Sequence, residues 1–514
     1  MAAPAGASRL RGHSRRLAGA PRQLAIALGA IFAIGAAFLV VTQSSEERIL
    51  LAAAAGIGLA MLVYCFLEEN IGRTLVLFLL YVTLLDGYLK LATGSELIVI
   101  GRDLLLGSIV AGMLVRAIVR RDLSIPPLTG AIVLYVGLVL VQIGHPDNSG
   151  LLHSIGGLRP HLEFVPLFFV AFVYLRTARR IRILFLLLLA VTAVNGAVAL
   201  MQYQLTPEEL SSWGPGYRER VLGGGDVAGR TAFSESVGEA RVRPFGLGSD
   251  VGFGGSLAIL AAPAGFALIS LRRRGGSRLL AAILGGGVVI ALVTSQARIT
   301  IVLAAVAALA YVALTSLSQR RLQLIAGLLI AGAVSWIALS IVSERTDSTV
   351  FDRYESIAPN QLVGTALDYK SATFALTREY LSDIPFGAGL GTVGPASNFA
   401  GLPLRTLDGE SQFNFLIVEL GIPGLAFMVL FVGGLLVLGF ARIPGMLDDQ
   451  VRPLLAAMGA ATIAILFGFS GAPVTAGVPL GPFLWITAGT FAYWLIHLPR
   501  VRRQAALLDH FQSR

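Results

Sequence analysis

The sequence predicts an all-α fold: a polytopic integral membrane bundle of about 12 to 14 transmembrane helices with two long outer loops, the second partly helical. Hydrophobic residues make up 55% of the chain and charged residues 14%. Mean hydropathy is +0.76. The hydrophobic residues are grouped into roughly fourteen apolar runs of about 15 to 25 residues. A helix of this length crosses a hydrocarbon core of about 30 Å. Helices also satisfy their own backbone hydrogen bonds there.

The apolar runs differ in how many polar residues or glycines interrupt them. The clear runs are Leu24–Thr42, Ile49–Leu67, Leu128–Gly144, Ile183–Gln202, Val251–Leu271, Ile299–Leu317, Leu322–Val342, Phe413–Phe440, Leu454–Phe469 and Leu480–Leu498. Polar residues or glycines interrupt the weaker runs, which are Thr74–Ala92, Leu97–Val115, Leu158–Leu175 and Leu279–Ser295. The basic stretch before Leu24 has no small-residue cleavage site after the apolar run, so that run is expected to be a signal anchor.

Arginine clusters at alternate connections predict the topology. By the positive-inside rule these connections are cytoplasmic, which places both termini inside and the two longest loops outside. The predicted divisions are a basic cytoplasmic N-terminus (1–23), N-terminal transmembrane helices (24–202), a first large outer loop (203–250), central helices (251–342), a large outer loop (343–412), C-terminal helices (413–498) and a basic cytoplasmic tail (499–514).

The net charge of +10 is concentrated at span ends, where it meets anionic lipid headgroups. A membrane lipid surface is therefore expected as a partner, and nucleic acid is not. Cys65 is the single cysteine, which excludes an intramolecular disulfide. No metal-ligand spacing of a recognisable type occurs, and neither a metal nor a cofactor is expected. Asp448 and Asp449 are best interpreted as charges in a solvated turn.

The second outer loop, of about seventy residues, is far longer than the usual connection of about 4 to 6 residues, so a function is expected in it. Apolar residues at helical spacing over Tyr369–Leu381 predict a helix near the membrane surface. Pro385 and the glycines Gly387, Gly389 and Gly391 would end it in a turn that brings backbone N–H groups close to a bound molecule. A plain helix stop is the alternative.

Several arginines are predicted on the outer side, against the positive-inside bias. Their guanidinium groups suit the oxygens of a lipid-linked pyrophosphate. For any one of them, pairing with Glu163, Asp250, Glu344 or Asp352 is the alternative. These arginines are Arg159, Arg241, Arg243, Arg298, Arg345, Arg353 and Arg378.

Two carboxylates flank the start of the run Phe413–Phe440. Glu410, at the mouth of the predicted site, could act as a general base toward a sugar hydroxyl, or be a solvated charge. Glu419, about two turns inside, is expected to hold a backbone or arginine partner and to support a helix break at Gly421, Pro423 and Gly424.

Charges are also predicted inside two earlier spans. Arg102 and Asp103 lie about two turns inside the span Leu97–Val115. They are expected to be functional, and a structural ion pair between neighbouring helices is the alternative. Asp86 and Lys90 share a helix face and are expected to be structural.

Four segments in order resemble the O-antigen ligase and polymerase family of membrane glycosyltransferases, which act on undecaprenyl-pyrophosphate-linked glycans. The segments are GLRPHLEFVPLFF (157–169), RPFGLGSDVGFGG (243–255), TSQARIT (294–300), and IPFGAGLGT (384–392) with ESQFNFLIVELGIPG (410–424). The resemblance covers roughly the last two thirds of the chain.

The resemblance implies that Arg243 and Arg298 contact the donor pyrophosphate and stabilise the leaving group. With Glu410, these are the expected catalytic residues. Transfer would be inverting and metal-independent, and the large outer loop would cover the site. The expected substrate-binding residues are Arg159, Arg241, Arg353, Arg378, Gly389, Ser411 and Glu419. The protein is then expected in a bacterial inner membrane, with its site facing the periplasm or cell exterior.

Ligases of the family have a His-Asn pair where this chain has Glu410-Ser411. That difference favours a polymerase of surface polysaccharide repeats, with a glycan or lipid acceptor and a link to polysaccharide export or chain-length machinery. The alternatives are an O-antigen ligase that uses a lipid A core or another acceptor, a transporter of polysaccharide or lipid-linked sugar, and a structural partner of a polysaccharide machine. A transporter would show repeated halves, and the sequence has no internal repeat.

Overall fold

The computed structural model describes most of the chain. The described residues are 46–95, 97–121, 124–146, 150–223, 232–234, 240–271, 275–315, 371, 373–393, 411–502 and 504. They belong to two compact units, one within residues 1–79 and 96–124 and the other within residues 80–95 and 125–514.

The first unit is a small group of apolar helices, in which α2 (Glu46–Leu67) packs against α5 (Leu97–Arg120). The two helices approach closely because Gly112 has no side chain, and a Cβ there would clash with the Phe66 carbonyl. Arg116 Nη1 donates to the same carbonyl oxygen at 2.7 Å. This unit also contains most of α3 (Ile71–Leu80). Arg102 Nε and Asp103 Oδ1 lie 3.9 Å apart on α5, so this predicted charge pair lies along one helix.

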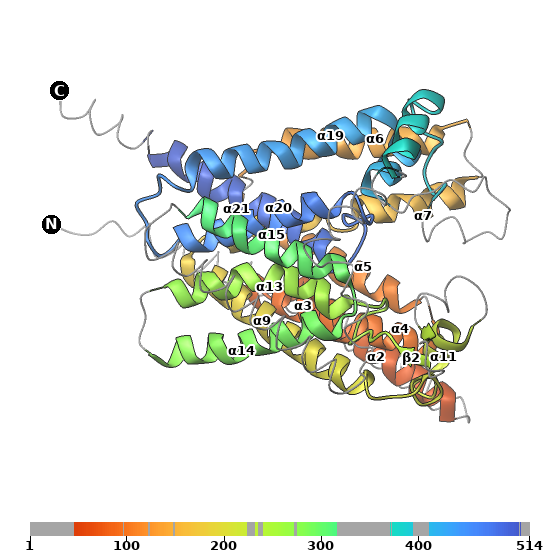
Figure 1. Cartoon of the computed structure of the whole chain (residues 1–514). Helices are drawn as coiled ribbons and strands as arrows, with labels where there is room; N and C mark the ends of the chain where they lie inside the picture. Colours follow the sequence, from red (N-terminus) through yellow and green to blue (C-terminus); the bar gives the residue numbers. More distant parts are fainter. Residues whose placement is uncertain are drawn as a thin grey trace, which may run out of the picture. The chain divides into compact units, whose positions relative to one another are not determined.

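The second unit holds most of the described helices. In chain order they are η1 (Tyr81–Leu85), α4 (Asp86–Thr93), α6 (Thr129–Val141), η2 (Gln142–Gly144), α7 (Leu151–Leu162), α8 (Pro166–Tyr174), α9 (Ala178–Gln202), α13 (Phe253–Ser270), α14 (Gly275–Thr294), α15 (Arg298–Leu314), α19 (Gln412–Arg442), α20 (Arg452–Gly468), α21 (Leu480–Phe491) and η4 (Ala492–His497). A further helix covers residues 373–383. Figure 1 shows α13, α15 and α20 running side by side.

Small residues allow close helix approaches in this second unit. A Cβ on Gly287 of α14 would clash with Ala193 of α9, and one on Gly489 of α21 would clash with the Phe168 carbonyl of α8. Membrane helices gain association energy from such close packing. Of the three consecutive glycines at 285 to 287, only Gly287 makes this kind of contact.

Six helices of the described part are long and apolar enough to cross a membrane. They are Ile71–Thr93, Ile98–Arg120, His153–Tyr174, Ala178–Gln202, Phe253–Ser270 and Gln412–Arg442. Shorter apolar helices cover Gly56–Leu67, Thr129–Gly144, Ile283–Thr294, Arg298–Leu314 and Arg452–Gly468. Every predicted run on described residues is helical, which supports a helical membrane protein. Leu24–Thr42 and Leu322–Val342 lie outside the described residues, so the total of 12 to 14 spans stays a prediction.

The first predicted outer loop contains regular structure that an all-α fold leaves out. Two short strands, β1 (Ala232–Ser234) and β2 (Ala240–Val242), pair antiparallel with Phe233 opposite Arg241. Before them come α10 (Pro207–Ser211) and α11 (Pro215–Leu222). A capping box between Thr206 and Glu209 starts α10.

These short elements surround a small hydrophobic cluster with the end of α4. It consists of Leu91, Leu210, Tyr217, Val221, Val242 and Phe245. We call residues 205–222 and 240–245, which supply most of it, the cap. The cap includes Arg243, so it overlaps the start of segment 243–255, one of the segments expected to bind the donor.

Candidate functional site

The break in α19 is the centre of the candidate site. Gly421 has φ 67° and ψ −167° inside an otherwise helical segment, as predicted from Gly421, Pro423 and Gly424. The Ser411 side chain caps the helix by accepting from the Asn414 N–H at 3.0 Å. The short first half of α19, from residue 412 to residue 420, therefore carries Glu419 at its end.

A glycine-rich turn fills the break. We call residues 385–393 the glycine turn; it follows the helix over 373–383, as the sequence predicts. Gly387, Gly389 and Gly391 have φ values of 87°, 90° and 76°, which L side chains adopt at a cost. The Ala388 N–H donates to the Val418 carbonyl at 2.6 Å, and the Ile422 N–H donates to the Pro385 carbonyl at 2.8 Å. The turn thus completes the hydrogen bonding that α19 loses at its break.

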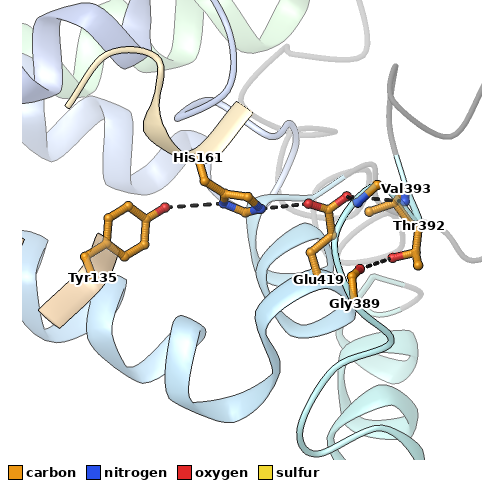
Figure 2. Close-up of polar contacts among 7 residues, drawn as sticks. Tyr135, His161, Gly389, Thr392, Val393 and Glu419 are labelled. Atoms are coloured by element: carbon orange, nitrogen blue, oxygen red, sulfur yellow. Dashed lines mark hydrogen bonds and ion pairs between the residues drawn. The ribbon is translucent and has the colours of Figure 1, made fainter. Parts of the chain in front are cut away.

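Glu419 joins this turn to α7. One carboxylate oxygen, Oε1, accepts from the backbone N–H of Gly391 at 3.1 Å and of Val393 at 3.4 Å. The other, Oε2, lies 2.7 Å from His161 Nε2. Figure 2 shows the row of side chains continuing to Tyr135, whose hydroxyl is 3.3 Å from His161 Nδ1. All three side chains are buried, so the network lies inside the helix packing.

Aromatic rings enclose the far end of the network. His161 stacks on Phe415 with ring centroids 4.9 Å apart, and Tyr135 stacks on Phe427 at the same distance. Trp485 packs on Tyr135 at 6.0 Å. This apolar shell fixes the rings and excludes water, and it strengthens the polar contacts within it.

The expectation that Glu419 holds a backbone partner is confirmed, and its side-chain partner is a histidine rather than an arginine. The turn's N–H groups at 391 and 393 are engaged by this carboxylate. His161 and Tyr135 were absent from the predicted site, although His161 falls inside the family-like segment 157–169. A histidine within an apolar helix was the one signal that could have identified it.

Two further segments come together elsewhere in the second unit. The Gly252 N–H donates to the Pro244 carbonyl at 3.0 Å, which closes the loop that follows Arg243. A Cβ on Gly252 would lie 3.1 Å from the Ala297 Cβ. Arg243 and Arg298 therefore belong to loops that touch, and both side chains are half-buried.

Arg298 is also the first residue of α15. Unpaired N–H groups and the helix dipole make a helix start favourable for an anion. Among the described residues, Arg298 has no carboxylate partner.

The end of α20 links the Arg298 helix to α19. The Phe469 carbonyl accepts from the Gln412 N–H at 2.8 Å, next to Ser411. A Cβ on Gly468 would lie 3.3 Å from Leu303 Cδ1, a little more than one turn along α15 from Arg298. The start of α15 and the start of α19 therefore lie at the same end of α20.

The other predicted residues differ in their surroundings. Arg159 Nε lies 3.6 Å from Glu163 Oε2, the structural pairing that was the alternative. Asp250 pairs with Arg220 at 3.4 Å. Arg378 is exposed, while Gly389 and Ser411 are buried. Arg241 is in β2, and its side chain is not described. Residues outside the described part are Glu410, Arg353, Arg345, Glu344 and Asp352.

Among the described residues, no group of three or more His, Cys, Asp or Glu side chains could hold a metal ion. Neither a protein-family model nor a curated protein matches the sequence.

Proposed function

We propose that this protein is a membrane glycosyltransferase of the O-antigen ligase and polymerase type. It transfers a glycan from undecaprenyl pyrophosphate to an acceptor sugar hydroxyl at the outer face of the membrane. The proposed reaction extends surface polysaccharide repeats, and joining the glycan to a lipid A core is the ligase alternative. The proposal places the protein in a bacterial inner membrane.

One observation carries the proposal. Arg243 and Arg298, distant in sequence, lie on loops that touch, and the loop of Arg298 opens a helix whose start suits an anion. A pyrophosphate needs paired cationic donors of this kind. Ser411 and the glycine turn lie at the same end of the neighbouring helices, where an acceptor hydroxyl would have to approach.

In the proposed reaction the acceptor hydroxyl attacks the anomeric carbon of the donor sugar. A new glycosidic C–O bond forms as the C–O bond to the pyrophosphate breaks, with inversion at that carbon. Glu410 takes the proton from the attacking hydroxyl, and Arg243 and Arg298 stabilise the charge that develops on the departing lipid pyrophosphate. The bond that forms and the bond that breaks are at the same carbon, so the transfer needs no further reactant.

The test is a gel assay on purified protein in liposomes, supplied only with a lipid-pyrophosphate-linked repeat from the host's own pathway. A ladder of lengthening products is expected for a polymerase. A product that forms only when a separate acceptor is added would indicate a ligase. No product under either condition would contradict the transferase proposal.

Substitution of the arginines tests the donor site directly. Arg298→Ala and Arg243→Ala should each lower kcat by about 10²- to 10³-fold, because each removes a donor to the leaving group. Arg179→Ala, at an exposed position of α9, is the matched control and should retain activity. Unchanged turnover in both site variants would favour a structural partner over an enzyme.

A transporter is the second candidate, because the break of α19 at Gly421 resembles the discontinuous helices at transporter sites. Flux of the intact lipid-linked repeat across liposomes, without product formation, would favour it.

A further inference from the structure

We propose that Glu419 and His161 form a positioning clamp that holds the glycine turn in the break of α19. The clamp itself is independent of the protein's activity. Its catalytic consequence, that the turn must be held for transfer to occur, rests on the proposed function.

The clamp is built from three parts of the chain that are far apart in sequence. Glu419 belongs to α19, His161 to α7, and Gly391 and Val393 to the turn. The two carboxylate oxygens have different partners, since Oε1 accepts from both turn N–H groups and Oε2 contacts His161. Removal of the carboxylate would leave two turn N–H groups and one imidazole nitrogen without partners in a buried site.

Neighbouring contacts from η2 and α7 also hold the turn. Gln142 Nε2 donates to the Phe386 carbonyl at 2.8 Å. A Cβ on Gly157 of α7 would clash with the backbone at Leu390 and Gly391. Steric fit therefore places the turn against α7, and Glu419 supplies the polar contact that fixes it there.

The arrangement favours positioning over proton transfer. A proton path needs a further donor or acceptor at each end, and this row ends in backbone N–H groups at one side. At the other side Tyr135 is enclosed by Phe427 and Trp485. Within the described residues, the Tyr135 hydroxyl forms its hydrogen bond with His161. The network is thus closed, as expected for a structural clamp.

The helix over 373–383, which leads into the glycine turn, contacts the start of α19. Its Thr377 hydroxyl donates to Asn414 Oδ1 at 2.6 Å. Phe374 and Phe413 pack with ring centroids 6.2 Å apart. Ser411, next to the proposed base, caps the first turn of α19. Loosening the clamp would therefore misplace the acceptor side of the site and leave the arginine loops in place.

The experiment compares Glu419→Gln with Glu419→Leu. The Gln amide oxygen can accept from Gly391 and Val393. Its NH₂ group can donate to His161 Nε2 when the imidazole proton is on Nδ1, from which it donates to the Tyr135 hydroxyl. This variant therefore keeps the clamp without a carboxylate. Leu has a similar volume and keeps none of these bonds. Backbone hydrogen exchange of a peptide covering the turn, and kcat and KM for the lipid-linked donor, are measured for both variants in liposomes.

Wild type and Glu419→Gln should protect the turn equally, with kcat within about threefold of each other. In Glu419→Leu the turn should exchange at least tenfold faster, and kcat should fall at least tenfold while the donor KM changes less than threefold. His161→Phe, which keeps a ring against Phe415, provides a second loosened variant should Glu419→Leu fail to fold.

Two results would overturn the proposal. Full protection of the turn in Glu419→Leu, or in His161→Phe when the former does not fold, would show that the clamp does not hold it. A protected turn with lost turnover in Glu419→Gln would show that the charge, not the position, matters. Absence of transferase activity in the wild type would refute the proposed function. Hydrogen exchange needs no substrate, so it would still show whether the clamp holds the turn.

Discussion

Gln202 shows how one buried amide can place a loop that carries a candidate catalytic residue. Its Oε1 accepts from the N–H groups of Phe245 at 2.9 Å and Gly246 at 2.8 Å. Its Nε2 donates to the Gly246 carbonyl at 2.9 Å. The Gln202 side chain thus attaches the segment just after Arg243 to the end of α9.

Gln202→Leu should destabilise the protein and weaken donor binding, because three buried backbone groups lose their partners at about 1–3 kcal/mol each. Thermal unfolding in detergent, followed by tryptophan fluorescence, measures the stability. Gln204→Leu, at an exposed position two residues later, is the control and should leave the midpoint unchanged. Equal midpoints for both variants would contradict this role of Gln202.

Tyr217, in the cap, allows a prediction of pH dependence. Burial, with a smaller contribution from Tyr88, raises the pKa of the Tyr217 hydroxyl above its ordinary value of about 10. The unfolded chain then loses this proton at a lower pH than the folded cap. Stability is fully present below pH of about 10 and falls as the pH rises further. The hydroxyl also has no hydrogen-bond partner among the described residues.

Tyr217→Phe should therefore be neutral or stabilising by about 1 kcal/mol at pH 8, and should lose less stability than wild type at pH 10.5. Unfolding midpoints of wild type and Tyr217→Phe at the two pH values measure this. A marked loss of stability in Tyr217→Phe at pH 8 would mean that the hydroxyl has a partner.

Some residues of the site can be predicted from the sequence, because their type alone limits their role. Glu419 was expected to need a partner because a carboxylate about two turns inside a span is costly, and Gly389 was expected in the turn. His161, Tyr135 and Gln202 were missed. Each acts through contacts with distant parts of the chain, and one sequence does not report such contacts.

At the scale of elements, the break of α19 can be tested with a glycine pair in one helix. Gly421 has φ 67°, and a Cβ there would lie 2.6 Å from the Pro385 carbonyl oxygen. Gly421→Ala should displace the glycine turn and abolish most activity. A Cβ on Gly433 would meet nothing within 4 Å. Gly433→Ala should then keep full activity and be neutral to stabilising, because alanine favours helix.

Proteolysis at the turn and the liposome transfer assay measure both variants. Equal activity of the two would mean that the break can be straightened without consequence.

The sequence predicts the helices that are defined by a long apolar run. It does not predict short elements that are stabilised only by packing against one another. The long helices follow from hydropathy, and the end of the helix over 373–383 follows from Pro385 and three glycines. The cap was not predicted. Its two helices and its strand are too short for a periodic pattern, and Leu210, Tyr217 and Phe245 hold them around one shared cluster.

At the scale of the whole molecule, the second half of α19 is expected to run from the candidate site to the opposite side of the membrane. From residue 422 to residue 442 it has 21 residues, which rise about 30 Å, enough to cross a hydrocarbon core. The glycine turn and the helix over 373–383 lie at its start. The connection to α20, with Asp448 and Asp449, follows its end. The site and this connection should therefore face opposite compartments.

Cysteine labelling tests this expectation and the predicted orientation together. Cys65 is the single cysteine and is buried, so Cys65→Ala gives a background for Glu379→Cys and Asp449→Cys, both at exposed positions. A membrane-impermeant maleimide on intact cells should label position 379 and not position 449. After permeabilisation it should label both. Labelling of position 449 alone in intact cells would mean that the orientation is opposite to the predicted one. The site would then lie on the cytoplasmic side, where a donor presented at the outer leaflet could not reach it. Labelling of both in intact cells would mean that the second half of α19 does not cross the membrane.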